Sequence, residues 1–108
     1  MHNDHGIFER GAAQCRKIRL TFFAGEPRRE LISQCGPLYF SSGRAAMNEP
    51  DCYYFWDFEA KVGRNFMALV PSDIVAMELT ENSFSLEEIH GSRRRTEHSR
   101  SGNGPAGI

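Results

Sequence analysis

Aromatic side chains are the residues of this chain best suited to binding, and they are concentrated in one segment. Five rings occupy positions 53–58, and the rest of the chain holds seven. Successive side chains of a strand leave opposite faces of a sheet. The two faces of this segment then hold Tyr54, Trp56 and Phe58 on one side, and Tyr53, Phe55 and Asp57 on the other. One face must belong to the core, and the acid is expected to mark the end of its face as close to solvent.

Residues for catalysis are scattered along the chain. No serine lies in a Gly-x-Ser-x-Gly motif, and His90 is the only histidine expected in the ordered part. Asp57 and Glu59 stand two apart and are able to share a strand face, but a solvated pair is the simpler interpretation. The cysteines match no paired Cys-x-x-Cys motif, so reduced, half-buried thiols are expected at Cys15, Cys35 and Cys52. We therefore expect no enzyme, no metal site and no cofactor.

Alternation of apolar and polar residues predicts the elements that position these side chains. Arg16–Phe23 alternates with Ile18, Leu20 and Phe22 on one face and basic residues on the other. The segment 64–70 is apolar on both faces, so we expect a central strand or one that faces a partner. The remaining expected segments are a helical turn at 7–14, strands at 28–35, 38–40, 51–58 and 75–80, a helical turn at 71–74, and a polar loop at 41–50. Phe84, Leu86 and Ile89 are expected to pack back as a short terminal segment.

Composition and charge bound the class of protein. A chain of 108 residues with 40% hydrophobic residues fits one domain with a real core. We divide it into a flexible N-terminus at 1–6, where His2 and His5 are too mobile to form a metal site, a β-rich domain at 7–90, and a disordered basic tail at 91–108. No apolar run approaches the roughly 20 residues of a membrane span, and the first residues resemble no signal peptide. We expect a cytoplasmic protein without membrane contact.

The order of several short motifs resembles one known family. The motifs are the strand 16–23, the turn Glu26-Pro27-Arg28-Arg29, the aromatic strand ending near Asp57, Arg64-Asn65-Phe66, Asp73-Ile74, Met77-Glu78-Leu79 and Asn82-Ser83-Phe84. Over roughly residues 10–90 this order resembles the WYL domain, a bacterial family whose members commonly serve as ligand-sensing modules of transcription regulators. The Trp-Tyr-Leu tripeptide is absent, and too few residues precede residue 10 for a helix-turn-helix. The resemblance therefore implies a stand-alone, Sm-like small β-barrel.

The fold class expected from pattern and resemblance together is mainly β: a small, strongly bent antiparallel sheet or a partly open Sm-like barrel with short helical turns. For sites, the resemblance implies a basic groove lined by aromatic rings. The matching positions are Arg19, Arg28, Arg29, Tyr54, Trp56 and Arg64.

Two functions follow from these residues. Rings stack on bases with ~1–3 kcal/mol each, and arginines bind phosphate oxygens in pairs, which favours a non-catalytic module that binds a nucleotide or single-stranded nucleic acid. Against this, an arginine on an outer strand face usually pairs with a carboxylate, such as Glu30 or Glu78 beside Arg19. The alternative is a protein-interaction or homodimerisation module, in which Tyr54, Trp56, Met67 and Leu69 form an aromatic and methionine interface.

Overall fold

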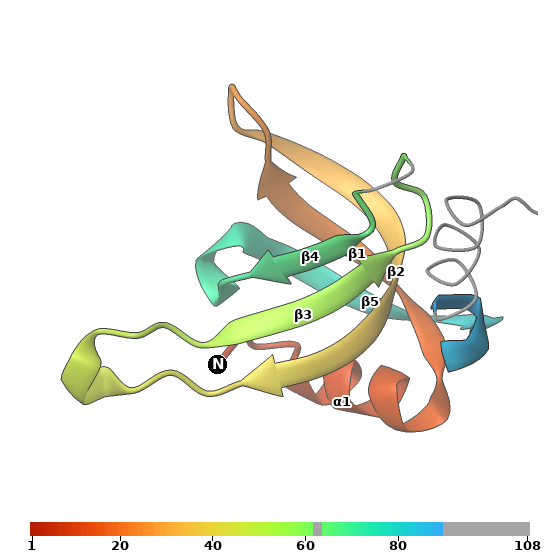
Figure 1. The fold of residues 1–108 in the computed structure, drawn as a ribbon, viewed down its shortest axis with the longest axis horizontal. Coiled ribbons are helices and arrows are strands. Elements are labelled where there is room, and N and C mark those ends of the chain that lie inside the picture. Colours follow the sequence, from red (N-terminus) through yellow and green to blue (C-terminus); the bar gives the residue numbers. More distant parts are fainter. Residues whose placement is uncertain (62–63, 90–108) are drawn as a thin grey trace, which may run out of the picture.

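The chain folds mainly as β-sheet, as the sequence predicts. The structure is a computed structural model that describes residues 1–61 and 64–89 (Figure 1). The predicted tail at 91–108 and His90 lie outside the described residues. The elements, in chain order, are α1 (His5–Gln14), β1 (Arg16–Ala24), β2 (Arg29–Ser41), η1 (Ala45–Met47), β3 (Cys52–Asp57), β4 (Phe66–Leu69), η2 (Pro71–Asp73) and β5 (Ile74–Ser83), followed by a helical turn at 86–89.

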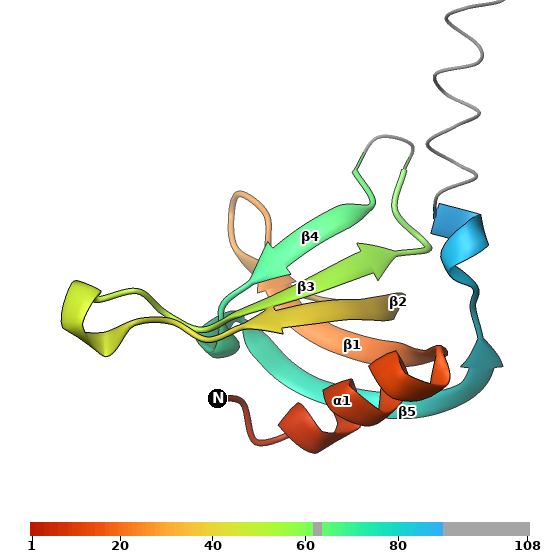
Figure 2. The ribbon, with the colours of Figure 1, turned by 60° about the horizontal axis from the view of Figure 1, so that its bottom comes forward.

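All five strands belong to one antiparallel sheet, with the order β4-β3-β2-β1-β5. The long strand β2 is shared between two halves of this sheet. Its residues up to Cys35 pair with β1, and its residues from Cys35 onward pair with β3. The sheet is strongly curved, and helix α1 packs against β1, β2 and β5 (Figure 2). The sheet is not closed, so β4 and β5 are its two edges.

The inner face of the bent sheet carries the core. Ile18, Leu20 and Phe22 of β1 are buried as their alternation predicts. From β3, Tyr53 and Phe55 point the same way and are fully buried. Alternation within a strand therefore places two of the five clustered rings in the core and leaves Tyr54 and Trp56 on the other face.

Helix α1 closes the core from below. The ring of Phe8 meets those of Tyr53 and Phe55 edge to face, with centroids 4.9 and 5.3 Å apart. Gly11 is one of the two buried residues of this helix. A Cβ atom there would lie 3.0 Å from Pro37 Cγ and 3.1 Å from Ile18 Cδ1. The glycine therefore lets the helix approach the sheet closely.

The two strands expected at 28–35 and 38–40 form a single strand, β2 (Arg29–Ser41). Gly36 and Pro37 do not break β2, because both remain paired with β3, opposite Trp56 and Phe55. Strand β1 pairs with β2 only as far as Cys35. Pro37 therefore lies in a part of β2 with one neighbouring strand, where a missing amide hydrogen is tolerated. A register shift follows between Pro37 and Tyr39.

The expectation that the apolar segment 64–70 forms a central strand is wrong, because β4 is an edge strand that pairs only with β3. Its inner residues Met67 and Leu69 pack on or within the core. Its outer residues Phe66 and Ala68 are exposed. An apolar pattern on both faces thus reflects one buried face and one uncovered face, rather than burial on both sides.

The two glycines of α1 provide a matched test of this packing. We expect Gly11→Leu to lower the free energy of unfolding by about 2 kcal/mol, because the new side chain overpacks the contact with Pro37 and Ile18. Gly6 is exposed with nothing within 4 Å of its Cβ position, so Gly6→Leu should change the same quantity by about 0.5 kcal/mol or less. Urea unfolding measures both. Equal effects of the two substitutions would contradict the close approach at Gly11.

Candidate functional site

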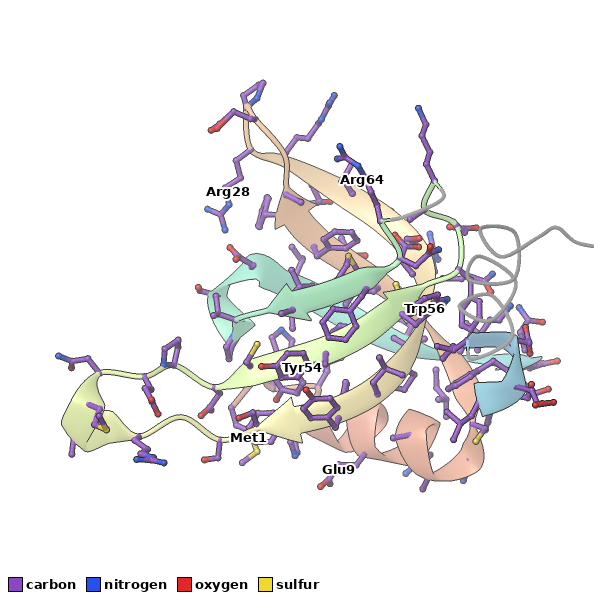
Figure 3. The ribbon with its side chains drawn as sticks, viewed as in Figure 1. Met1, Glu9, Arg28, Tyr54, Trp56 and Arg64 are labelled. Atoms are coloured by element: carbon purple, nitrogen blue, oxygen red, sulfur yellow. The ribbon has the colours of Figure 1, made fainter. Side chains whose placement is uncertain are left out.

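Four partly or largely exposed aromatic residues lie on the outer side of β2, β3 and β4. We call this surface the outer aromatic face, and it consists of Tyr39, Tyr54, Trp56 and Phe66. Tyr39 is 55% exposed and Phe66 is 53% exposed, and the other two are half-buried. Tyr54 and Trp56 both project from β3 (Figure 3).

Strand register assembles this face from residues far apart in sequence. Tyr39 of β2 pairs with Tyr54, and Trp56 pairs with Phe66 of β4. Ala68 stands beside Tyr54 on the same face. The face is therefore a fixed row of rings across three strands. At the sheet edge it ends with the small side chain of Ala68 next to the large side chain of Phe66.

Ring geometry determines what this face offers to a ligand. The rings of Tyr39 and Tyr54 stack with centroids 4.3 Å apart and planes inclined by 18°. On the other side, Phe66 stacks on Tyr54 at 5.8 Å and 29°. Each side of the Tyr54 ring thus already has a ring neighbour, so this ring is poorly placed to stack on an incoming base. The part of the Tyr54 ring that remains open to a ligand is therefore largely its edge.

The structure does not gather the predicted arginines around these rings. Arg19, on β1, forms an ion pair with Glu78 of β5 at 3.4 Å, one of the two carboxylates expected beside it. Arg28 forms an ion pair with Asp73 and lies over the ring of Phe23 at 4.7 Å.

Figure 3 shows Arg28 beside the β1–β2 hairpin, well away from Tyr54 and Trp56. Arg29 begins β2 next to that hairpin turn, and Arg64 lies between β3 and β4. Of the six predicted site residues, Tyr54 and Trp56 therefore lie together, and Arg19 and Arg28 lie apart from them.

Asp57 is not close to solvent, contrary to the prediction. It is 8% exposed, and its carboxylate accepts hydrogen bonds from the Ser33 hydroxyl and, at 2.9 Å, from the backbone N–H of Glu59. Glu59 reaches the same Ser33 hydroxyl at 3.1 Å. The two carboxylates therefore meet at one buried serine, and Glu59 itself is exposed. Among the described residues, no group of three or more His, Cys, Asp or Glu side chains is placed to hold a metal ion.

The sequence interpretation missed a polar network at the N-terminus. Helix α1 begins at His5 rather than near residue 7. His5 Nδ1 and the Tyr53 hydroxyl form a 2.7 Å hydrogen bond, and the Tyr53 oxygen also accepts the backbone N–H of His2 at 3.1 Å. His5 Nε2 lies 3.3 Å from the Glu9 carboxylate. His2 and His5 thus contact the core residue Tyr53, within a segment whose polarity indicated flexibility.

A shallow groove lies beside this network, between α1 and the part of β2 that β1 does not reach. Its volume is about 530 Å³, and it is lined by His5, Phe8, Glu9, Ala12, Ala13, Tyr39 and Phe40.

The sequence did contain one signal for the longer helix: Asp4 stands at a position typical of a helix N-cap, ahead of the apolar pair Ile7 and Phe8. Its carboxylate instead accepts the backbone N–H of Met77 at 2.9 Å.

Burial shifts the pKa of two groups near these sites. Desolvation raises the pKa of the Tyr53 hydroxyl above its ordinary value. Desolvation also raises the pKa of the Cys35 thiol strongly, and the nearby Asp57 carboxylate adds to the effect. All three cysteines are free, with Cys35 buried and the other two half-buried.

Comparison with models of protein families, with curated proteins and with solved structures finds no match to this chain. Among the described residues, no helix has the length and apolar character needed to cross a membrane.

The neighbouring tyrosines of β3 make a matched pair for testing the network. We expect Tyr53→Phe to lower the free energy of unfolding by about 1–2 kcal/mol, because His5 and the His2 amide lose their shared partner. Tyr54→Phe should cost no more than about 0.5 kcal/mol, since Tyr54 lies on the partly exposed outer face. Urea unfolding at neutral pH measures both. A larger loss for Tyr54→Phe would contradict the assignment of the two faces.

Stability should fall at alkaline pH because of Cys35. The unfolded thiol loses its proton near its ordinary pKa of about 8.5, whereas the folded thiol keeps it because its pKa is raised. The folded state then binds more protons than the unfolded state, so rising pH favours unfolding by up to about 1.4 kcal/mol per pH unit. Urea unfolding between about pH 8 and 10 should give a steeper decline for the native protein than for Cys35→Ala. Parallel declines would contradict it.

Proposed function

We propose that this chain is a non-catalytic protein-interaction module that self-associates through its outer aromatic face and the adjoining edge strand β4. The observation that carries the proposal is the position of the exposed aromatic row directly beside an edge strand without charges. Tyrosine, tryptophan, phenylalanine and methionine are enriched in protein interfaces, whereas charged residues are depleted at their centres. Strand β4 consists of Phe66-Met67-Ala68-Leu69 and fits this composition.

The two edges of the sheet differ in how they are protected. Along β5, the Ile74 carbonyl is hydrogen-bonded by the side chain of His2 at 3.0 Å, and the Met77 amide by that of Asp4. This strand also carries two acidic residues, Glu78 and Glu81. Charged residues and covering segments are common means by which proteins prevent edge strands from pairing with other chains. Strand β4 carries neither a charge nor a proline, so it is the edge suited to association.

The interface differs in one respect from the one expected from sequence. Tyr54 and Trp56 belong to it, but Met67 and Leu69 point to the inner face with Tyr53 and Phe55. Phe66 and Ala68 take their places on the outer side.

Binding of a nucleotide or single-stranded nucleic acid is the second candidate function. It is favoured by Arg29 and Arg64, which form no ion pair within residues 1–61 and 64–89. The stacking of Tyr54 between two other rings and the engagement of Arg19 and Arg28 by carboxylates weigh against it.

Trp56 is the only tryptophan of the chain and reports directly on this surface. We expect acrylamide quenching of its fluorescence to decrease as protein concentration rises over roughly a hundredfold range, with little dependence on salt. Sedimentation should show association over the same range. A labelled single-stranded oligonucleotide, titrated at low and high salt, should leave the fluorescence unchanged. Binding that weakens steeply with salt would support the second candidate instead, and a monomer at every concentration would overturn self-association.

Two residues with the same exposure locate the contact. Phe66 and Ile32 are each 53% exposed, but Phe66 lies on the outer aromatic face and Ile32 lies in the half of β2 that pairs with β1. We expect Phe66→Ala to weaken self-association at least about tenfold, measured by sedimentation, and Ile32→Ala to leave it unchanged. Equal effects would place the contact elsewhere.

A further inference from the structure

The side chains of β4 alternate between the two faces of the sheet, and this alternation restricts how a second copy can pair with this edge. If two copies extend one sheet through β4, residues directly opposite each other must share a face. Phe66 and Ala68 are outer residues, and Met67 and Leu69 are inner residues. Antiparallel pairing about a two-fold axis keeps the outer faces continuous only when even-numbered residues meet even-numbered ones. The fullest overlap of the strand, Phe66 against Leu69, is excluded because it would set an outer residue opposite an inner one.

Two registers share the next fullest overlap of this four-residue strand, one with the two-fold axis at Met67 and one with the axis at Ala68. We consider the axis at Met67 first. Each Met67 then lies opposite Met67 of the second copy, and each Phe66 lies opposite Ala68 of the second copy. An axis at Phe66 would oppose two large rings, and an axis at Ala68 would oppose two methyl groups and leave each Phe66 beyond the strand. Only the axis at Met67 matches a large outer side chain with a small one at both ends of the contact.

We propose that two copies of this chain pair antiparallel through β4 about a two-fold axis at Met67, with Phe66 of each copy seated over Ala68 of the other. The proposal rests on the proposed function and specifies its geometry. Since Tyr54 adjoins Ala68 and Trp56 adjoins Phe66, each outer row would continue from Tyr39 and Tyr54 across Ala68 to Phe66 and Trp56 of the second copy. The two rows run in opposite directions, as two-fold symmetry requires.

Charge is compatible with self-pairing in this register. A two-fold contact brings only the residues close to the axis near their own copies, so a charged residue there would be repelled by the same charge in the second copy. The strand itself is uncharged, and the cationic residue nearest to it in sequence is Arg64, three residues before Met67. Its two copies would lie at opposite ends of the paired strands, roughly 20 Å apart at 3.3 Å per residue.

Cysteine cross-linking distinguishes this register from its neighbours. Directly opposed residues of antiparallel strands have Cα atoms about 4.5–5.5 Å apart, within disulfide reach, whereas diagonal neighbours are about 7–8 Å apart. In a background with Cys15→Ser and Cys52→Ser, and with buried Cys35 retained, Met67→Cys should form a disulfide-linked dimer under mild oxidation. Ala68→Cys should not, because its counterpart lies on the diagonal.

The possible outcomes distinguish failure of the proposed register from failure of self-association, the function on which the register rests. Cross-linking of Ala68→Cys but not Met67→Cys would move the axis and overturn this register while leaving self-association intact. A dimer by sedimentation in which neither variant cross-links would exclude an axis at either residue and so overturn the proposed register. Absence of any dimer would overturn the proposed function itself.

A second pair of variants tests the contact between Phe66 of one copy and Ala68 of the other without the need for oxidation. Ala68→Arg should weaken dimerisation at least about tenfold, because the new side chain fills the space of the opposing ring and places like charges near the axis. Val75→Arg adds the same charge at an exposed position of β5, which is 43% exposed, and should leave dimerisation unchanged. Urea unfolding shows whether each variant is folded. If folded Ala68→Arg dimerised as tightly as the native protein, the contact between Phe66 of one copy and Ala68 of the other would be excluded.

Discussion

The alternation of side chains along β3 is the constraint on which the rest of this structure depends. Adjacent large rings cannot share one face of a strand, so the burial of Tyr53 and Phe55 forces Tyr54 and Trp56 outward. The buried pair in turn provides the surface on which Phe8 packs, and this contact positions helix α1. One six-residue strand therefore determines both the lower closure of the core and the composition of the surface opposite it.

The hydroxyl of Tyr53 extends this constraint to the edges of the sheet. It binds His5 and the amide of His2, which brings the N-terminal residues against the sheet. There the amide of Asp4 donates to His2 Nδ1, so His2 Nε2 carries the proton that it donates to the Ile74 carbonyl. The side chain of Asp4 binds the Met77 amide beside it. Burial of one tyrosine is thus coupled to protection of β5, and the molecule is left with β4 as the less protected edge.

Local alternation was sufficient to predict β1, β3 and β5, and Pro71 was sufficient to predict the turn at η2, because each of these signals is contained within a few residues. The continuity of β2 through Gly36 and Pro37 was not predictable locally, since it depends on pairing with β3. The edge position of β4 likewise depends on which strands are neighbours. Within the site, alternation identified Tyr54 and Trp56 as a pair, but Tyr39 and Phe66 join them only through register. The carboxylate partner of Arg28, Asp73, lies 45 residues away in sequence and had no local signal.

The internal order of the outer aromatic face bears on what it can bind with little free-energy cost. Association must overcome the entropy lost when mobile side chains become fixed. Here Tyr54 is already held between Tyr39 and Phe66 before any partner arrives, so little ordering remains for it to undergo. The same stacking denies this ring to a base, which would have to displace a neighbour in order to insert. Rings that are packed against each other, next to an unpaired backbone edge, therefore favour extension of the sheet by another polypeptide strand over intercalation of a planar ligand.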